Sequence, residues 1–291
     1  MQVNNLLCFL ALISLSLGSC KSADPDFSEG HIALEPGMSM SYRLCGQGDT
    51  TLLFIHGWGI DKTYWKPQLD AFCPQYRVVT IDLPGFGLSG KNRTEWTFDQ
   101  YAEDVKKGID HLGLKKVILI GHSMSGDLIL KVATTYPDNI IGLIGIDNLH
   151  QPGAPMDSIQ VVQSESFFGM MLQDFDSTVI KNMKAGLFQP STPDSVVRRV
   201  MNDVFAADSV IAVKVLMGMT KMAQAEQAMM QQLQVPLCLV NSDVYPTDLE
   251  SLNKYCAKGV KLYTVKGSGH YPMIEKTEEF NKALQRAIWI Q

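Results

Sequence analysis

Short apolar runs alternate with amphipathic stretches over most of this chain, and the alternation predicts repeated strand and helix. The runs YRVVTI (76–81) and KVILI (116–120) are almost wholly apolar, which is typical of strands buried on both faces. Between them, Tyr101, Val105 and Ile109 recur at four-residue spacing and predict a helix over 98–112. Further strands are predicted at 38–44, 51–55, 140–146, 236–240 and 260–265, and further helices at 62–72, 248–257 and from Thr277 onward. This order predicts an α/β fold with a mostly parallel sheet and functional groups at the carboxyl ends of its strands.

The rhythm breaks over residues 150–232, which contain no apolar run of the core type. Helical stretches replace it, such as 193–206, where Thr192 and Pro193 occupy the predicted cap and first-turn positions. Ten of the fifteen methionines also fall in this segment. We expect a helical cap at 150–232, inserted between a first core part at 31–149 and a second at 233–291.

The beginning of the chain indicates export. Residues 6–17 form an apolar run that is too short for an ordinary membrane span and is typical of a signal peptide. It ends in Leu-Gly-Ser before Cys20, which resembles a bacterial lipobox, although the usual basic residues at the start are missing. We therefore expect a signal peptide at 1–19, a lipid on Cys20, a polar tether at 20–30 and attachment to a bacterial cell-envelope membrane. The alternative is plain secretion with an incidental cysteine.

Composition narrows the classes of partner. The 291 residues are 46% apolar and 19% charged, which is ordinary for a globular protein and excludes wholesale disorder. With 25 basic and 30 acidic residues, the net charge of −5 offers no general footprint for DNA or RNA. The remaining cysteines show no ligand spacing, so no metal site is predicted and their disulfide pairing stays open: Cys45, Cys73, Cys238 and Cys256.

The strongest chemical motif is Gly-His-Ser-Met-Ser-Gly at 121–126. It lies directly after the strand at 116–120 and before a predicted helix, which is the setting of a nucleophile elbow. Such a sharp turn requires small residues two positions before and after the nucleophile. Gly121 and Ser125 both satisfy this, although a glycine is more usual at the second position. We predict that Ser123 is a catalytic nucleophile.

A second motif, His-Gly-Trp-Gly at 56–59, follows the strand at 51–55. Acyl transfer places negative charge on a carbonyl oxygen, and two fixed N–H donors stabilise it. We predict that the backbone N–H groups of Trp58 and Met124 form this oxyanion hole. His56 is expected to support the turn, and Asp82, which opens the loop after 76–81, is expected to have a structural role as well.

A general base and its carboxylate complete the chemistry. His270 ends the sequence Gly-Ser-Gly-His after the last predicted strand, which favours a role as the general base. The acid is ambiguous. Asp243 follows the strand after the cap and is the prediction, Asp147 after the strand 140–146 is the rival, and Asp248 is expected to cap the next helix.

Together these motifs resemble the α/β-hydrolase superfamily over nearly all of the chain after residue 30. The stretch from the 56–59 motif through residues 82–90 is similar to carboxylesterases such as pimeloyl-carrier methyl esterases. The resemblance implies a serine hydrolase without a cofactor, acting on a small-molecule substrate, and we expect a carboxylic ester of small or medium apolar size. Amidase, carbon–carbon bond hydrolase and perhydrolase activities use the same triad and stay open. The non-enzymatic alternative, a binding protein on a hydrolase fold, predicts a broken triad, and the oligomeric state stays open.

Overall fold

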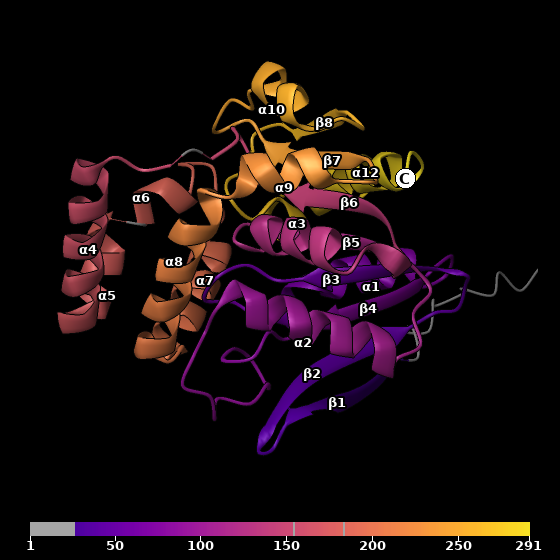
Figure 1. Ribbon diagram of the computed structural model, residues 1–291, viewed down its shortest axis with the longest axis horizontal. Helices are drawn as coiled ribbons and strands as arrows, with labels where there is room; N and C mark the ends of the chain where they lie inside the picture. The colour runs from indigo at the N-terminus through magenta and orange to yellow at the C-terminus, as the bar shows by residue number, and fades with distance from the viewer. Residues whose placement is uncertain (1–26, 154, 183) are drawn as a thin grey trace, which may run out of the picture.

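A computed structural model of the protein describes residues 27–153, 155–182 and 184–291. Its centre is an eight-stranded sheet in the order β1-β2-β4-β3-β5-β6-β7-β8, and Figure 1 shows this order from β1 at the bottom to β8 at the top. Strand β2 pairs antiparallel with both of its neighbours, β1 and β4. All the other neighbouring strands pair in parallel. This confirms the predicted mostly parallel α/β sheet. The strands are β1 (Phe27–Glu35), β2 (Met38–Cys45), β3 (Thr50–Ile55), β4 (Arg77–Ile81), β5 (Lys116–His122), β6 (Ile140–Ile146), β7 (Leu237–Ser242) and β8 (Val260–Val265).

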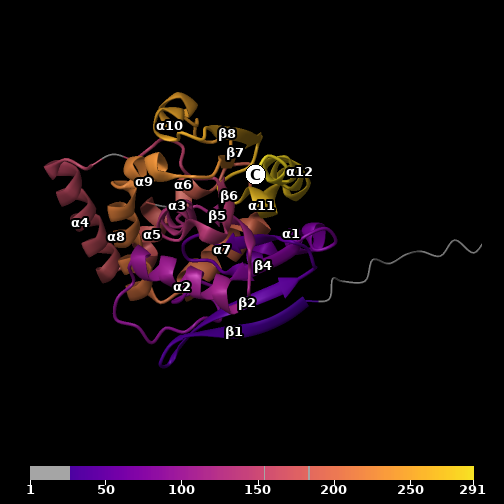
Figure 2. The ribbon, with the colours of Figure 1, turned by 45° about the vertical axis from the view of Figure 1, so that its right-hand side comes forward.

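Helices cover both faces of the sheet. In Figure 2, α2 and α3 lie on one side of the strands, and α1 and α12 lie on the other. Helix α2 buries Tyr101, Val105 and Ile109, the positions that the periodicity predicted, and begins with a capping box formed by Thr97 and Gln100. The helices of the core are η1 (Lys62–Trp65), α1 (Lys66–Phe72), α2 (Phe98–His111), α3 (Ser125–Thr135), η2 (Pro137–Asn139), α10 (Leu249–Tyr255), α11 (Pro272–Glu275) and α12 (Thr277–Ile288).

Between β6 and β7 the described residues form six helices, and we call this segment the cap. Figure 1 shows α4 to α8 on the left, beyond the carboxyl ends of the parallel strands, while α9 packs on α3. Helix α7 begins within a residue of the predicted 193–206, but its N-cap is Pro193, and Thr192 makes other contacts that are described below. The cap helices are α4 (Ser158–Gln173), α5 (Phe175–Asn182), α6 (Lys184–Leu187), α7 (Asp194–Ala206), α8 (Ser209–Ala223) and α9 (Glu226–Gln232).

The start of the chain differs from the sequence-based expectation. Residues 27–30, expected to belong to a polar tether, form the first part of β1, because this strand alternates exposed residues with the buried Ile32 and Leu34. The apolar run 6–17 and Cys20 lie outside the described residues. Among the helices that are described, none combines the length and the apolar character needed to cross a membrane.

The cysteines divide into a bonded pair and two thiols. Cys45 at the end of β2 and Cys73 directly after α1 form a disulfide, and their Cα atoms are 5.6 Å apart. Cys238 and Cys256 are free and buried. Burial raises the pKa of the Cys238 thiol to about 11, so this group stays protonated and acts as an apolar core residue. The disulfide ties the beginning of the sheet to the helix that covers it.

Candidate active site

Ser123 sits on a sharp turn between β5 and α3. Its φ is 52°, in the left-handed region that side chains rarely adopt. The main chain closes tightly here, because a Cβ on Gly121 would collide with the carbonyl oxygen of Ser125. The Ser123 N–H donates to the carbonyl of Ile146 on β6 (3.0 Å). The turn therefore holds the Ser123 side chain above the carboxyl edge of the sheet, as the elbow motif predicted.

A continuous chain of hydrogen bonds connects a serine, a histidine and a carboxylate at this edge. Ser123 Oγ lies 2.8 Å from His270 Nε2, and His270 Nδ1 lies 2.6 Å from Asp147 Oδ2. An ionised carboxylate only accepts hydrogen bonds, so the proton of the neutral imidazole belongs on Nδ1. Nε2 is then free to accept the proton of the Ser123 hydroxyl. This is the mutual geometry that a nucleophile and a general base require.

Asp147 occupies a second left-handed turn, with φ 47°, at the end of β6. Its side chain is only 2% exposed. Its Oδ1 accepts the N–H of Ser242 on β7 (2.8 Å), while Oδ2 faces His270. Burial alone would raise the pKa of Asp147, but the hydrogen bonds from His270 and Ser242 outweigh it and lower the pKa below its ordinary value. Asp147 is therefore ionised at neutral pH and can orient the imidazole.

The prediction that Asp243 contacts the histidine is wrong. Strand β7 continues to Ser242, two residues beyond its predicted end, and Asp243 follows it with an exposed side chain. Its Oδ1 accepts the N–H of Gly267 in the turn after β8 (2.8 Å). It is Ser242, one residue earlier, whose N–H meets Asp147. Asp248 caps α10 through the N–H of Ser251, as the sequence indicated.

The His-Gly-Trp-Gly turn packs directly against the elbow. A Cβ built on Gly57 would collide with Nδ1 of the buried His122 ring and would lie 3.1 Å from Ser123 Cβ, so only glycine allows this approach. The backbone N–H groups of Trp58, in this turn, and of Met124, next to Ser123, take no part in the backbone hydrogen bonds of the described turns, loops and caps. The indole N–H of Trp58 donates to the Ala212 carbonyl in the cap (2.8 Å), which fixes the turn in place.

His56 and Asp82 support these loops from below. His56 is fully buried, donates from Nδ1 to the Gly57 carbonyl (2.7 Å) and accepts the N–H of Leu83 at Nε2 (2.9 Å). Burial lowers its pKa, so the ring stays neutral. The Asp82 carboxylate accepts a hydrogen bond from the Lys62 ammonium (2.6 Å) and from the backbone N–H groups of Lys62 and Leu88. These contacts give both residues the supporting positions that the sequence suggested.

His122 is a residue that the sequence analysis did not single out. It precedes Ser123, is buried, and its Nε2 donates to the backbone carbonyl of His270 (2.7 Å). Burial, reinforced by the neighbouring His270, lowers the pKa of His122 to about 3. The ring is therefore neutral and adds no positive charge beside His270, whose ring centroid is 4.8 Å away. The one available signal was its place beside the nucleophile.

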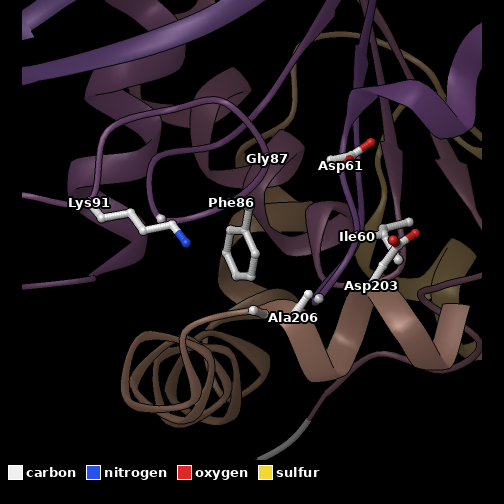
Figure 3. Close-up of a pocket in the computed structure, with 10 residues that line it drawn as sticks. Ile60, Asp61, Phe86, Gly87, Lys91, Asp203 and Ala206 are labelled. Atoms are coloured by element: carbon white, nitrogen blue, oxygen red, sulfur yellow. The ribbon is translucent and has the colours of Figure 1, made fainter.

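A separate cavity of about 150 Å³ lies where the end of the His-Gly-Trp-Gly turn (56–59, here called the oxyanion turn), the loop after β4 and cap helix α7 meet. Figure 3 shows Lys91 and Phe86 on one side of it and Asp61 and Asp203 on the other. Ser123, His270 and Asp147, which we call the triad, do not line this cavity. Within the described ranges, no three His, Cys, Asp or Glu side chains are grouped so that they could hold a metal ion.

Comparison with known proteins agrees with this geometry. Over 211 residues the chain is 28% identical to a dihydrolipoyllysine-residue acetyltransferase component of the acetoin cleaving system from Pseudomonas putida. That match covers 72% of this chain but spans only half of the length of the relative. A pimeloyl-[acyl-carrier protein] methyl ester esterase from Aliivibrio salmonicida is 24% identical over 257 residues, 86% of this chain and 96% of that protein.

Among solved structures, an esterase from Thermogutta terrifontis superposes with a TM-score of 0.77 at 21% identity and covers 90% of this chain and 98% of its own. The family described as the alpha/beta hydrolase fold matches residues 50–200, more than half of the 291 residues. That span contains the oxyanion turn, the elbow and Asp147. The chain belongs to the α/β-hydrolase family.

Proposed function

We propose that the protein is a serine hydrolase that cleaves a carboxylic ester of small or medium apolar size through an acyl-enzyme. The observation that carries the proposal is the unbroken series of hydrogen bonds from Ser123 through His270 to Asp147. A non-catalytic binding protein has no need of such a series. Serine in place of aspartate at the elbow also disfavours dehalogenase and epoxide hydrolase chemistry.

In the first half-reaction, Ser123 Oγ attacks the ester carbonyl carbon while His270 Nε2 takes the hydroxyl proton. Asp147 stabilises the imidazolium that forms. The carbonyl oxygen becomes negatively charged and is bound by the N–H groups of Trp58 and Met124. When the tetrahedral intermediate collapses, the bond to the alcohol oxygen breaks, and that oxygen takes the proton from His270.

In the second half-reaction, water replaces the alcohol. His270 Nε2 removes a proton from the water as its oxygen attacks the acyl carbon, and the same N–H donors bind the new oxyanion. Collapse returns the proton to Ser123 Oγ and releases the carboxylic acid. No atom outside the chain, the ester and water is needed, so the proposed cycle requires no cofactor.

An apolar substrate fits the side chains that the cap brings to the triad. Phe188 of the cap stacks on Tyr271, the residue after His270, with ring centroids 5.9 Å apart. Phe175 of α5 packs against Trp58 of the oxyanion turn at 6.0 Å. Two of the similar proteins named above, from Aliivibrio salmonicida and Thermogutta terrifontis, are esterases by name. The aromatic contacts favour an apolar substrate, and the two named esterases favour an ester over the alternative bonds.

The proposal is tested by labelling the wild-type protein with a fluorophosphonate probe and then measuring turnover of p-nitrophenyl esters from acetyl to dodecanoyl. We expect covalent labelling and a maximum of kcat/KM at short or medium chains, because aromatic side chains of the cap pack against the neighbours of the triad. Matched anilides measure amidase activity in the same assay. A protein that is neither labelled nor active on any ester would contradict the proposal.

We also propose that Cys20 carries a lipid that holds the protein on a cell-envelope membrane. The apolar run and Leu-Gly-Ser-Cys support this, and the Cys45–Cys73 disulfide fits an oxidising compartment. Phe27 pairs with Cys45, which in turn pairs with Val78 near the start of β4. The described chain thus begins at the edge where the parallel strands start, opposite the triad. Six residues span at most about 20 Å, so an anchored protein would present its active site away from the membrane.

Replacing Cys20 by alanine is therefore expected to prevent lipid attachment, because the thiol is the acceptor of the lipid. The measurement is metabolic labelling with a fatty-acid analogue in cells that express wild type or Cys20→Ala. Cys256→Ala, which removes a buried thiol near the other end of the chain, is the matched control and should label like wild type. Equal incorporation in wild type and Cys20→Ala, or none in either, would contradict the lipid anchor.

A further inference from the structure

Hydrogen bonds from both the core and the cap hold the main chain around His270. His270 lies in the loop between β8 and α11, which the glycines at 267 and 269 would leave free to move. Its own N–H donates to the carbonyl of Leu187 at the end of cap helix α6 (3.1 Å), and its carbonyl accepts the Nε2–H of His122. The loop is therefore fixed on one side by the core and on the other by the cap.

Glu275 binds the two residues that flank His270. Its Oε2 accepts the N–H of Gly269 (2.8 Å), and its Oε1 accepts the N–H of Tyr271 (3.0 Å). A Cβ on Gly269 would lie 2.9 Å from Oε1, so the absent side chain is what allows the carboxylate this close. Hydrogen bonds to an ionised carboxylate are stronger than neutral ones. One side chain thus fixes the main chain immediately before and after the proposed general base.

The same carboxylate is also bound by the cap. Thr192 Oγ1 donates to Glu275 Oε2 (2.7 Å) and accepts the N–H of Gln189 (3.0 Å), so its hydroxyl both donates and accepts a hydrogen bond. Thr192 is only 7% exposed. This explains why it does not cap α7, as its sequence position suggested. The turn 189–192 of the cap therefore shares a hydrogen-bond acceptor with the loop of His270.

We propose that Glu275 is a positioning residue for His270 and that Thr192 makes this positioning depend on the seating of the cap. When the cap is in place, Thr192 and Leu187 hold Glu275 and the loop so that His270 Nε2 meets Ser123 at 2.8 Å. When the cap is displaced, both contacts are lost and the imidazole loses its alignment. The expected effect on kcat rests on the proposed function. The expected effect on the hydrogen bond between His270 and Asp147 does not.

Glu275→Gln and Thr192→Val are the informative variants. The amide of Glu275→Gln keeps one acceptor oxygen where two N–H groups need acceptors, and its NH2 group faces the other N–H. We therefore expect kcat to fall roughly 10- to 100-fold, the size typical of small misplacements of a catalytic group. Thr192→Val loses one hydrogen bond to Glu275, and we expect a loss of about three- to tenfold. Both should leave KM nearly unchanged. Thr192→Ser keeps the hydroxyl and should retain most of the wild-type activity. The matched control is Glu278→Gln, because Glu278 is an exposed carboxylate three residues after Glu275, and this variant should behave like wild type.

The readout that a merely structural role would not move is the proton NMR signal of the hydrogen bond between His270 Nδ1 and Asp147. We expect this low-field signal to shift or broaden in Glu275→Gln and Thr192→Val, at temperatures well below unfolding, and to persist in Thr192→Ser. Unchanged kcat and an unchanged signal in Glu275→Gln would overturn the proposal. If that variant does not fold, equal kcat in Thr192→Val and Thr192→Ser overturns it instead.

The signal also separates the two proposals. A wild-type protein that fails to react with the fluorophosphonate overturns the proposed function, yet its NMR signal still reports whether Glu275 positions the imidazole. Conversely, an active wild type whose Glu275 variants are fully active overturns only the present inference.

Discussion

Replacing Ser123 by alanine is expected to abolish ester hydrolysis and fluorophosphonate labelling while the protein stays folded. Ser123 Oγ is the nucleophile of the proposed reaction, and no other hydroxyl is placed at His270 Nε2 in the hydrogen bonds of the described residues. Removing the nucleophile of a serine hydrolase costs about 10⁶-fold in kcat. Alanine also accepts the turn without new contacts, because it only deletes the hydroxyl. The measurements are probe labelling, turnover of the best ester and the thermal unfolding midpoint.

Ser125 is the matched control, since it lies two residues away on the same elbow. Its Oγ donates to the backbone carbonyl of His56 (2.6 Å) and is completely buried. Ser125→Ala therefore loses a structural hydrogen bond, which costs about 1 kcal/mol of stability, but it should keep its label. Labelling that survives Ser123→Ala and disappears in Ser125→Ala would move the nucleophile.

Much of this architecture could be predicted because short stretches of sequence determine the strands and turns that build it. Short apolar runs specified the five central strands β3 to β7, since parallel strands that are buried on both faces leave little room for polar residues. The elbow and the oxyanion turn were also readable, because their steric needs are met by small residues at fixed spacing, such as Gly57 and Gly121. The polar beginning of β1 gave no such signal, and that strand was found only where β2 pairs with it.

The choice of the acid could not be made from the chain alone. Asp147 and Asp243 both follow strands whose carboxyl ends reach the edge where His270 lies. What separates them is where the strand ends and which way the next side chain points, and both depend on pairing between strands. β7 stays paired with β8 as far as Ser242 opposite Val265, which leaves Asp243 beyond the last pair. The contact between Glu275 and Thr192 was equally hidden, because it joins the last quarter of the chain to the cap.

Replacing Asp147 by asparagine is the second change with a large expected effect. The asparagine oxygen can still accept the Ser242 N–H, but its amide cannot accept the proton on His270 Nδ1. The imidazole then favours the tautomer with its proton on Nε2, which cannot take a proton from Ser123. Such a replacement lowers kcat about 10⁴-fold. Because Asp147 is buried, the unfolding midpoint of Asp147→Asn must be measured beside its kcat.

Asp243→Asn is the matched control, and it tests the correction that the structure makes to the sequence. Asp243 is exposed, and an asparagine oxygen can still accept the Gly267 N–H, so kcat should stay within about twofold, as for most exposed substitutions. Each variant replaces one carboxylate oxygen by an NH2 group, and the two positions lie at the ends of neighbouring strands. A general effect of removing a negative charge would therefore lower kcat in both. A large loss in Asp243→Asn with an active Asp147→Asn would mean that the loop after β7 rearranges during turnover to bring Asp243 to the imidazole. The hydrogen bond of 2.6 Å between His270 and Asp147 leads us to expect the opposite order.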